Sequence, residues 1–225
     1  MPRKACISKC RACCANRHEH PRPAPRPAPG PDAETLSVYD RKASEYRDLT
    51  ARSEINPDLA SFLGALPAGS DVLDLGCGPG AAAAVMAAAG HHVTATDAAP
   101  EMVKLAAQHP GVTARHATFD DIDAQDAYDA IWANFSLLHA PREDMPRHLT
   151  ALRRALRPGG LLHIGMKTGS GSARDALGRL YTYYSEDELA GLLRDAGFTP
   201  FSARHGKDTG LDGTVAPWVT LAAHG

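Results

Sequence analysis

Residues 72–80 read Val-Leu-Asp-Leu-Gly-Cys-Gly-Pro-Gly. An apolar run this short, interrupted by one acid, is typical of a parallel strand that is covered on both faces. The three alternate glycines free the backbone for a sharp turn and allow a ligand to approach it closely. The alanine-rich run 81–89 predicts a helix that ends at Gly90. The stretch therefore predicts a strand, a turn and a helix whose free N–H groups face a ligand.

Two kinds of cofactor fit this turn. Gly76-x-Gly78-x-x-Ala81 matches the dinucleotide fingerprint, which allows alanine at the last position. Asp74 argues against a dinucleotide, because its carboxylate would lie beside the pyrophosphate and repel it. It would attract a cationic amino-acid end, such as the ammonium and sulfonium of S-adenosylmethionine. A plain strand–turn–helix that binds no ligand is the third interpretation.

An acid also follows the next predicted strand, residues 92–96. Asp97 comes 21 residues after Gly76, close to the offset of about 20 residues at which an acid in such folds binds ribose hydroxyls. Both cofactors carry that ribose, so Asp97 does not distinguish between them. The alternative is a cap for a helix that begins at Pro100.

The order of these motifs resembles class I S-adenosylmethionine-dependent methyltransferases. Asp74–Gly80 is followed by Asp97 and then by Leu-Arg-Pro-Gly-Gly at 156–160, before an apolar strand. The resemblance covers the chain from about Ser37 onward and is closest to small stand-alone bacterial members. It implies an α/β, Rossmann-like sheet of seven strands with helices on both faces and the last strand antiparallel. The implied reaction is in-line transfer of the sulfonium methyl group to an acceptor.

The same resemblance implies which residues hold the cofactor, S-adenosylmethionine. Some of them also have a plainer interpretation: Tyr46 as a packing residue of a surface helix, Ala98 and Met102 as core residues, and Asp120 as a loop acid. The acids near Asp120 come one or two residues later than in the common family pattern. The predicted cofactor-binding set is Tyr46, Asp74, Gly76, Cys77, Gly78, Gly80, Asp97, Ala98, Met102, Phe119, Asp120 and Asn134.

His139 is the candidate catalytic residue, because a histidine near the predicted cleft is suited to proton transfer at neutral pH. The alternative is a histidine at a helix end that bonds to a loop. The glycine- and serine-rich stretch 167–179 predicts a loop over the acceptor side of the cleft. Candidate acceptor contacts lie in and after it: Arg174, Arg179, Tyr181, Tyr183 and Tyr184.

Hydrophobic periodicity and capping signals predict the remaining elements. Helical character is expected over 35–49, a helix begins at Asn56-Pro57, and a capping box at Ser185 begins another that Gly197 ends. Another helix carries an apolar stripe at residues 149–156. Further strands are predicted over 112–116, 128–134, 161–166, 198–205 and 216–223.

The first 31 residues differ in composition from the rest. Cys6, Cys10, Cys13 and Cys14, with His18 and His20, precede a run of Pro, Arg and Ala. We expect a disordered extension, or a start site assigned too far upstream, because the segment has almost no apolar residues to bury. A small metal site is the alternative, although the spacing fits no paired Cys-x2-Cys arrangement. The predicted domains are thus 1–31 and 32–225.

Composition limits the partners. The formal net charge of −2 gives no reason to expect nucleic acid, and no apolar run approaches the length of a membrane span. The lack of a secretory signal and of a disulfide framework predicts a cytoplasmic protein. We expect a small-molecule acceptor, with an oligomeric state that the sequence does not define. An NAD-binding oxidoreductase and a non-catalytic S-adenosylmethionine-binding module stay open as alternatives.

Overall fold

The computed structural model describes residues 30–50 and 56–225. The predictions for the cysteine cluster and the proline run concern residues outside this part of the chain. Helices α1 to α7 span Ala33–Arg41, Ala43–Thr50, Pro57–Gly64, Ala81–Ala88, Pro100–Ala106, Met145–Ala155 and Glu186–Asp195. Strands β1 to β9 span Asp71–Leu75, His92–Asp97, Val112–His116, Tyr128–Asn134, Leu156–Lys167, Ser172–Arg174, Leu180–Thr182, Thr199–Thr209 and Val215–His224.

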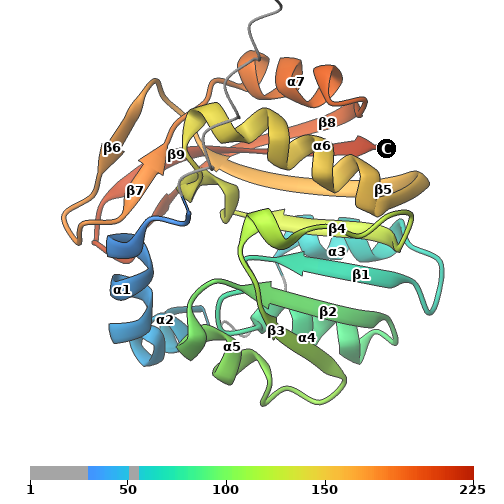
Figure 1. The fold of residues 1–225 in the computed structure, drawn as a ribbon, viewed down its shortest axis with the longest axis horizontal. Coiled ribbons are helices and arrows are strands. Elements are labelled where there is room, and N and C mark those ends of the chain that lie inside the picture. Colours follow the sequence, from blue (N-terminus) through green and yellow to red (C-terminus); the bar gives the residue numbers. More distant parts are fainter. Residues whose placement is uncertain (1–29, 51–55) are drawn as a thin grey trace, which may run out of the picture.

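A seven-stranded sheet runs through the molecule in the order β3-β2-β1-β4-β5-β9-β8 (Figure 1). The first five strands are parallel, and β9 is inserted antiparallel between β5 and β8. This order confirms the predicted fold. The chain winds from β1 out to β3 and then crosses back to β4 on the other side of β1, so the order reverses between the carboxyl ends of β1 and β4. Ligands bind at such a switch point in open α/β sheets.

Two apolar clusters cover the sheet. Helices α6 and α7 pack on one face through residues such as Leu149 and Leu189, and α3 and α4 pack on the other through residues such as Phe62 and Met86. Both faces of the parallel strands are therefore buried, which explains why β1 reads as a nearly continuous apolar run. Figure 1 shows α1 and α2 beside the carboxyl ends of β1 and β2.

The glycine turn has left-handed backbone at all three alternate positions, with φ of +67° at Gly76, +54° at Gly78 and +85° at Gly80. A Cβ at Gly76 would lie 2.3 Å from the Cβ of Ser136, and one at Gly80 would lie 2.8 Å from the Cα of Ala106. Glycine is required here both by the backbone conformation and by the close packing of the segments after β4 and in α5.

Three local expectations differ from the structure. The helical region 35–49 is divided into α1 and α2 at Lys42. Strand β5 begins at Leu156, earlier than expected, because Leu156 pairs with Tyr128 before a register shift in β4. The predicted loop 167–179 contains β6, which pairs with β7 as a two-stranded sheet.

The β6–β7 hairpin is bonded to α1. Arg174 donates to both oxygens of Asp32, and the backbone N–H of Leu180 donates to Thr35 Oγ1. The hairpin and α1 thus form one unit at the carboxyl end of the sheet. None of the helices in the described part has the length and apolar character that crossing a membrane requires.

Two glycine substitutions test the argument for the turn. Gly80→Ala should lower the free energy of unfolding by more than about 1 kcal/mol, because alanine is strained at this φ and meets α5. Gly191→Ala is the matched control in helix α7, where an added Cβ has nothing within 4 Å; it should stabilise by roughly 0.5–1 kcal/mol. Urea unfolding measures both, and equal effects of the two variants would contradict the argument.

Candidate cofactor and acceptor site

One cavity of about 720 Å³ lies at the carboxyl ends of β1, β2 and β4. Its walls also come from α1, α2 and the β6–β7 hairpin. The volume falls within the range of about 300–1,000 Å³ that is typical of small-molecule sites. The predicted site residues that line it are Tyr46, Asp74, Gly76, Cys77, Gly78, Asp97, Ala98, Met102, Phe119, Asp120, Asn134 and His139. Gly80 is not among the lining residues and packs against α5.

Asp74 is a buried acid at the cavity wall. Its side chain is 2% exposed, and its Oδ2 atom has no hydrogen-bond partner within the described residues. Burial, and then the nearby Asp97 carboxylate, raise the pKa of Asp74 to about 7. An unpartnered buried carboxylate oxygen is costly, so a cationic ligand group would find a strong partner here.

Asp97 holds the glycine turn in place. Its Oδ2 accepts the N–H of Gly78 at 2.9 Å and its Oδ1 accepts the N–H of Ala99 at 2.8 Å. Burial raises the pKa of Asp97 in spite of these bonds. Each carboxylate oxygen keeps a second lone pair, so the group can still accept from ligand hydroxyls. The helix cap of α5 is Ala99, which rules out the capping alternative for Asp97.

Tyr46 lies over the glycine turn. A Cβ at Gly78 would come within 3.3 Å of its ring, and its ring packs edge-to-face on Tyr39 at 5.5 Å between centroids. Cys77 lies in the same turn, where burial raises the pKa of its thiol far above the ordinary value. Burial thus disfavours the thiolate of Cys77, which lines the cavity, and its place in the cofactor site stays a prediction.

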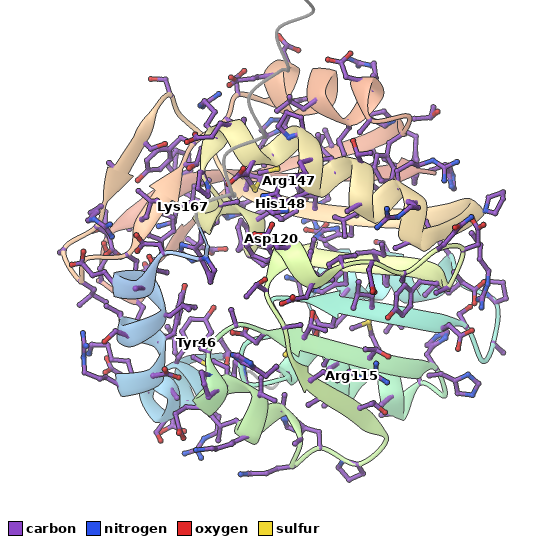
Figure 2. The ribbon with its side chains drawn as sticks, viewed as in Figure 1. Tyr46, Arg115, Asp120, Arg147, His148 and Lys167 are labelled. Atoms are coloured by element: carbon purple, nitrogen blue, oxygen red, sulfur yellow. The ribbon has the colours of Figure 1, made fainter. Side chains whose placement is uncertain are left out.

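The carboxylate of Asp120 already has charged and aromatic neighbours from α6, which the sequence did not indicate. It forms an ion pair with Arg147 of α6, and His148 Nδ1 lies 3.7 Å from its Oδ1 (Figure 2). The neighbouring Phe119 packs edge-to-face on His148. Asp120 lines the cavity with one oxygen already paired, so its role as an adenine acceptor stays a prediction.

Asn134 ends β4 and is fixed by β5. Its Oδ1 accepts from His163 Nε2 at 3.0 Å, and the His163 ring stacks on Trp132 at 3.8 Å between centroids. The next residue, Phe135, has φ of +56°, a conformation rare for a bulky side chain. Strained backbone of this kind clusters at functional sites, and Phe135 also lines the cavity.

His139 has both ring nitrogens occupied. Nδ1 lies 2.6 Å from the carbonyl of Leu180, and Nε2 lies 2.8 Å from the hydroxyl of Tyr39. Because a carbonyl only accepts, Nδ1 carries the proton and Nε2 accepts from Tyr39. Burial lowers the pKa of His139 to about 4. The ring is neutral at physiological pH and holds Tyr39 against the hairpin, so this geometry is closer to the loop-bonding alternative than to a free catalytic base.

The hairpin contributes Arg179 and Tyr181 to the cavity. Arg179 is buried, pairs with Asp175 at 2.6 Å, and donates to the Tyr39 hydroxyl at 3.2 Å. The other candidate acceptor contacts do not line the cavity. Arg174 binds Asp32 at the surface, Tyr184 packs under the guanidinium of Arg142, and Tyr183 stacks on Tyr181.

Sequence reasoning gave no site role to Lys167, Phe135 or Tyr39, all of which line the cavity. Tyr39 belongs to the helical segment 35–49, for which the family resemblance gave a contact role only to Tyr46. Lys167 stood at the start of a segment expected to be a loop. No pattern in the sequence indicated that these three side chains would converge, because they come from three distant segments.

The cavity has the features that S-adenosylmethionine requires. An unpartnered acid lies at the end of β1, a glycine turn leads into α4, and a second acid with free lone pairs ends β2. The fold and this site together define a Rossmann-like protein that binds a nucleoside with a cationic amino-acid group.

Comparisons with known proteins agree with this class. The family profile described as "Methyltransferase domain" matches residues 72–160. A ubiquinone biosynthesis O-methyltransferase of Xanthomonas axonopodis pv. citri is 34% identical over 167 residues, which cover 64% of this chain and 69% of that protein. Its namesake in Xanthomonas campestris pv. campestris is 31% identical over 185 residues, covering 78% and 71%.

A solved structure is also similar. It is the Burkholderia thailandensis 1,6-didemethyltoxoflavin-N1-methyltransferase with bound 1,6-didemethyltoxoflavin and S-adenosylhomocysteine. The TM-score is 0.70 at 27% identity, with 85% of this chain and 87% of that chain covered. The chain belongs to the class I S-adenosylmethionine-dependent methyltransferase family, and its cofactor is S-adenosylmethionine.

The bonding of His139 predicts its titration. The ring should stay neutral with the proton on Nδ1 down to about pH 5, because burial and the Leu180 carbonyl disfavour a second proton. Nitrogen-15 NMR of the histidine rings measures the tautomer and the pKa, with His139→Gln identifying the signal. A midpoint near 6.5 would contradict this geometry.

Asp74 predicts a pH dependence of stability. Its pKa is about 7 in the folded chain and about 3.9 in an unfolded one, so the folded state binds the proton more tightly. The stability of the ligand-free protein should therefore fall as pH rises from about 4 to 7. Asp74→Asn removes this loss, so the gain in Tm from the substitution should grow from pH 4.5 to pH 7.5. The exposed Asp123→Asn is the control, and a gain independent of pH would contradict the prediction.

Proposed function

We propose that the enzyme methylates a planar small molecule bound between the glycine turn and the β6–β7 hairpin. The observation that carries this proposal is one continuous cavity, which is lined both by Asp74 and Asp97 of β1 and β2 and by Arg179 and Tyr181 of the hairpin. Its volume of about 720 Å³ accommodates a nucleoside cofactor together with a small acceptor.

Different residues of the cavity bind different parts of the cofactor. Asp74 binds the ammonium of the amino-acid end, which supplies the partner that its Oδ2 lacks. The N–H groups at the start of α4 lie at the glycine turn, and Asp97 accepts from the ribose hydroxyls. Ala98, Met102 and Phe119, which line the same cavity, would hold the adenine.

When bound, S-adenosylmethionine would supply an electrophilic methyl group for in-line transfer to the acceptor. The protein contributes alignment and exclusion of water. Tyr39 and Tyr46 cover the cavity from α1 and α2. His139, neutral and bonded to Tyr39, positions this cover on the hairpin. We propose this positioning role for His139 in place of proton transfer.

An oxygen nucleophile is the acceptor atom that we favour. The curated relatives named above are O-methyltransferases of ubiquinone biosynthesis, and they are 31–34% identical to this chain. Nitrogen is the alternative, supported by the N1-methyltransferase of similar structure at 27% identity. A cytoplasmic location and the absence of a nucleic-acid partner remain predictions from composition.

Calorimetric titration tests the cofactor site. The protein should bind S-adenosylmethionine, and NAD should not compete, because Asp74 repels a pyrophosphate. Asp97→Asn should weaken S-adenosylmethionine binding by about tenfold or more, because its side chain loses one charged acceptor for the ribose hydroxyls. Asp123→Asn is the exposed control and should leave the affinity unchanged.

Two results would overturn these assignments. Unchanged affinity in Asp97→Asn would remove its ribose role, and a normal affinity in Asp74→Asn would remove the ammonium role.

Formation of S-adenosylhomocysteine with a panel of hydroxylated and amino-substituted aromatic compounds separates oxygen from nitrogen acceptors. Turnover confined to amines would overturn the choice of oxygen.

A further inference from the structure

Lys167 is a cation without a charged partner in the wall of the cavity. It is the last residue of β5, it is half-buried, and its ammonium lies 3.9 Å from the centre of the Tyr181 ring. Within residues 30–50 and 56–225, no carboxylate lies within 4.0 Å of its Nζ, and Nζ donates no hydrogen bond. Figure 2 shows Lys167 coming from β5 and Tyr46 from α2, in opposite halves of the molecule.

The neighbouring charges do not neutralise Lys167. Arg179 is matched by Asp175, with which it forms hydrogen bonds through both Nε and Nη2. Asp212, the nearby acid in the loop between β8 and β9, accepts from the N–H of Thr214 and lies beyond ion-pair distance. Burial lowers the pKa of Lys167, and the nearby Asp212 carboxylate, which acts in the opposite direction, does not offset this loss of water.

The surroundings of Lys167 are aromatic. Tyr181 lies beneath its ammonium, and Phe135 and Trp218 form an edge-to-face pair at 6.1 Å between centroids in the same cavity. Flat rings of this kind favour a planar ligand. A negative oxygen on such a ligand would supply the missing acceptor for the Lys167 ammonium in a site with restricted access to water.

We infer that the acceptor is a planar compound with an anionic oxygen, either a carboxylate or an ionised hydroxyl, and that Lys167 binds this oxygen and sets the preference for acidic acceptors. The inference rests on the proposed function, because it names the class of acceptor for the same cavity. Two side chains of the cavity wall are then complementary in charge to their ligands: Asp74 to the cationic cofactor, Lys167 to the anionic acceptor. The alternative is that Lys167 only packs on the Tyr181 ring.

Two probe pairs test the inference by calorimetry on protein saturated with S-adenosylhomocysteine at pH 8. The first pair is 4-hydroxybenzoate and its neutral amide, and the second is 4-nitrophenolate and neutral 4-nitroanisole. The anion of at least one pair should bind about tenfold more tightly than its neutral partner, the effect of one charged hydrogen bond. Preference in the first pair alone identifies a carboxylate, and preference in the second alone an ionised hydroxyl.

Variants assign the preference to Lys167. Lys167→Met keeps the packing on Tyr181 and should abolish the discrimination, whereas Lys167→Arg should keep it. Lys207→Met, an exposed lysine of β8 outside the cavity, should behave as the wild type. The KM of an acidic acceptor should rise in Lys167→Met more than kcat falls.

The inference is overturned if neither anion is preferred by the wild type, or if the preference survives in Lys167→Met. The wild-type comparison stands by itself if that variant does not fold. Failure of the wild type to bind S-adenosylhomocysteine would instead overturn the proposed function. The probe titrations on unloaded protein would then still report on Lys167.

Discussion

The close approach of the turn after β1 to its neighbours is the constraint on which the site depends. Gly76 packs where a Cβ would overlap Ser136, and Gly80 packs where one would overlap α5. Asp97 then fixes the middle of the turn through the N–H of Gly78. Three elements that follow β1, β2 and β4 are thereby held together, and the cavity is the space left between them.

This arrangement gives the three glycines a packing role in addition to the access that they allow a ligand. Their spacing suggested room for a ligand beside the backbone, which is one reason for glycine at such turns. In the structure, the positions of the missing Cβ atoms face Ser136, Tyr46 and Ala106. Glycine is thus demanded by the protein's own packing as much as by a ligand. The same turn serves both purposes because it is left-handed at each alternate position.

The acids of the site illustrate the limits of reading positions in a sequence. Asp74 was predicted from the glycine motif and Asp97 from its place after a strand, and both lie at the cavity, because the carboxyl ends of parallel strands share one edge of the sheet. Asp120 was predicted from the family resemblance, and Arg147 of α6 already occupies one of its oxygens. His139 was a candidate for proton transfer, with a loop-bonding histidine as the alternative, and Tyr39 and Leu180 occupy its nitrogens. Such partners come from distant segments of the chain, so the local sequence around Asp120 or His139 does not indicate them.

The sequence by itself indicated the parallel strands, the glycine turn and the acids beside it, and its resemblance to a family implied the cofactor. These properties are local, since they follow from periodicity, backbone freedom and the charge of residues next to a turn. Only the tertiary structure decided which side chains form the acceptor end of the cavity. Lys167, Phe135 and Tyr39 lie far apart in the chain, and they meet because β5 ends beside the β6–β7 hairpin, on which α1 packs. The chemistry of the acceptor is therefore determined by contacts between distant segments, whereas the two acids that indicate the cofactor lie at the ends of two neighbouring strands, β1 and β2.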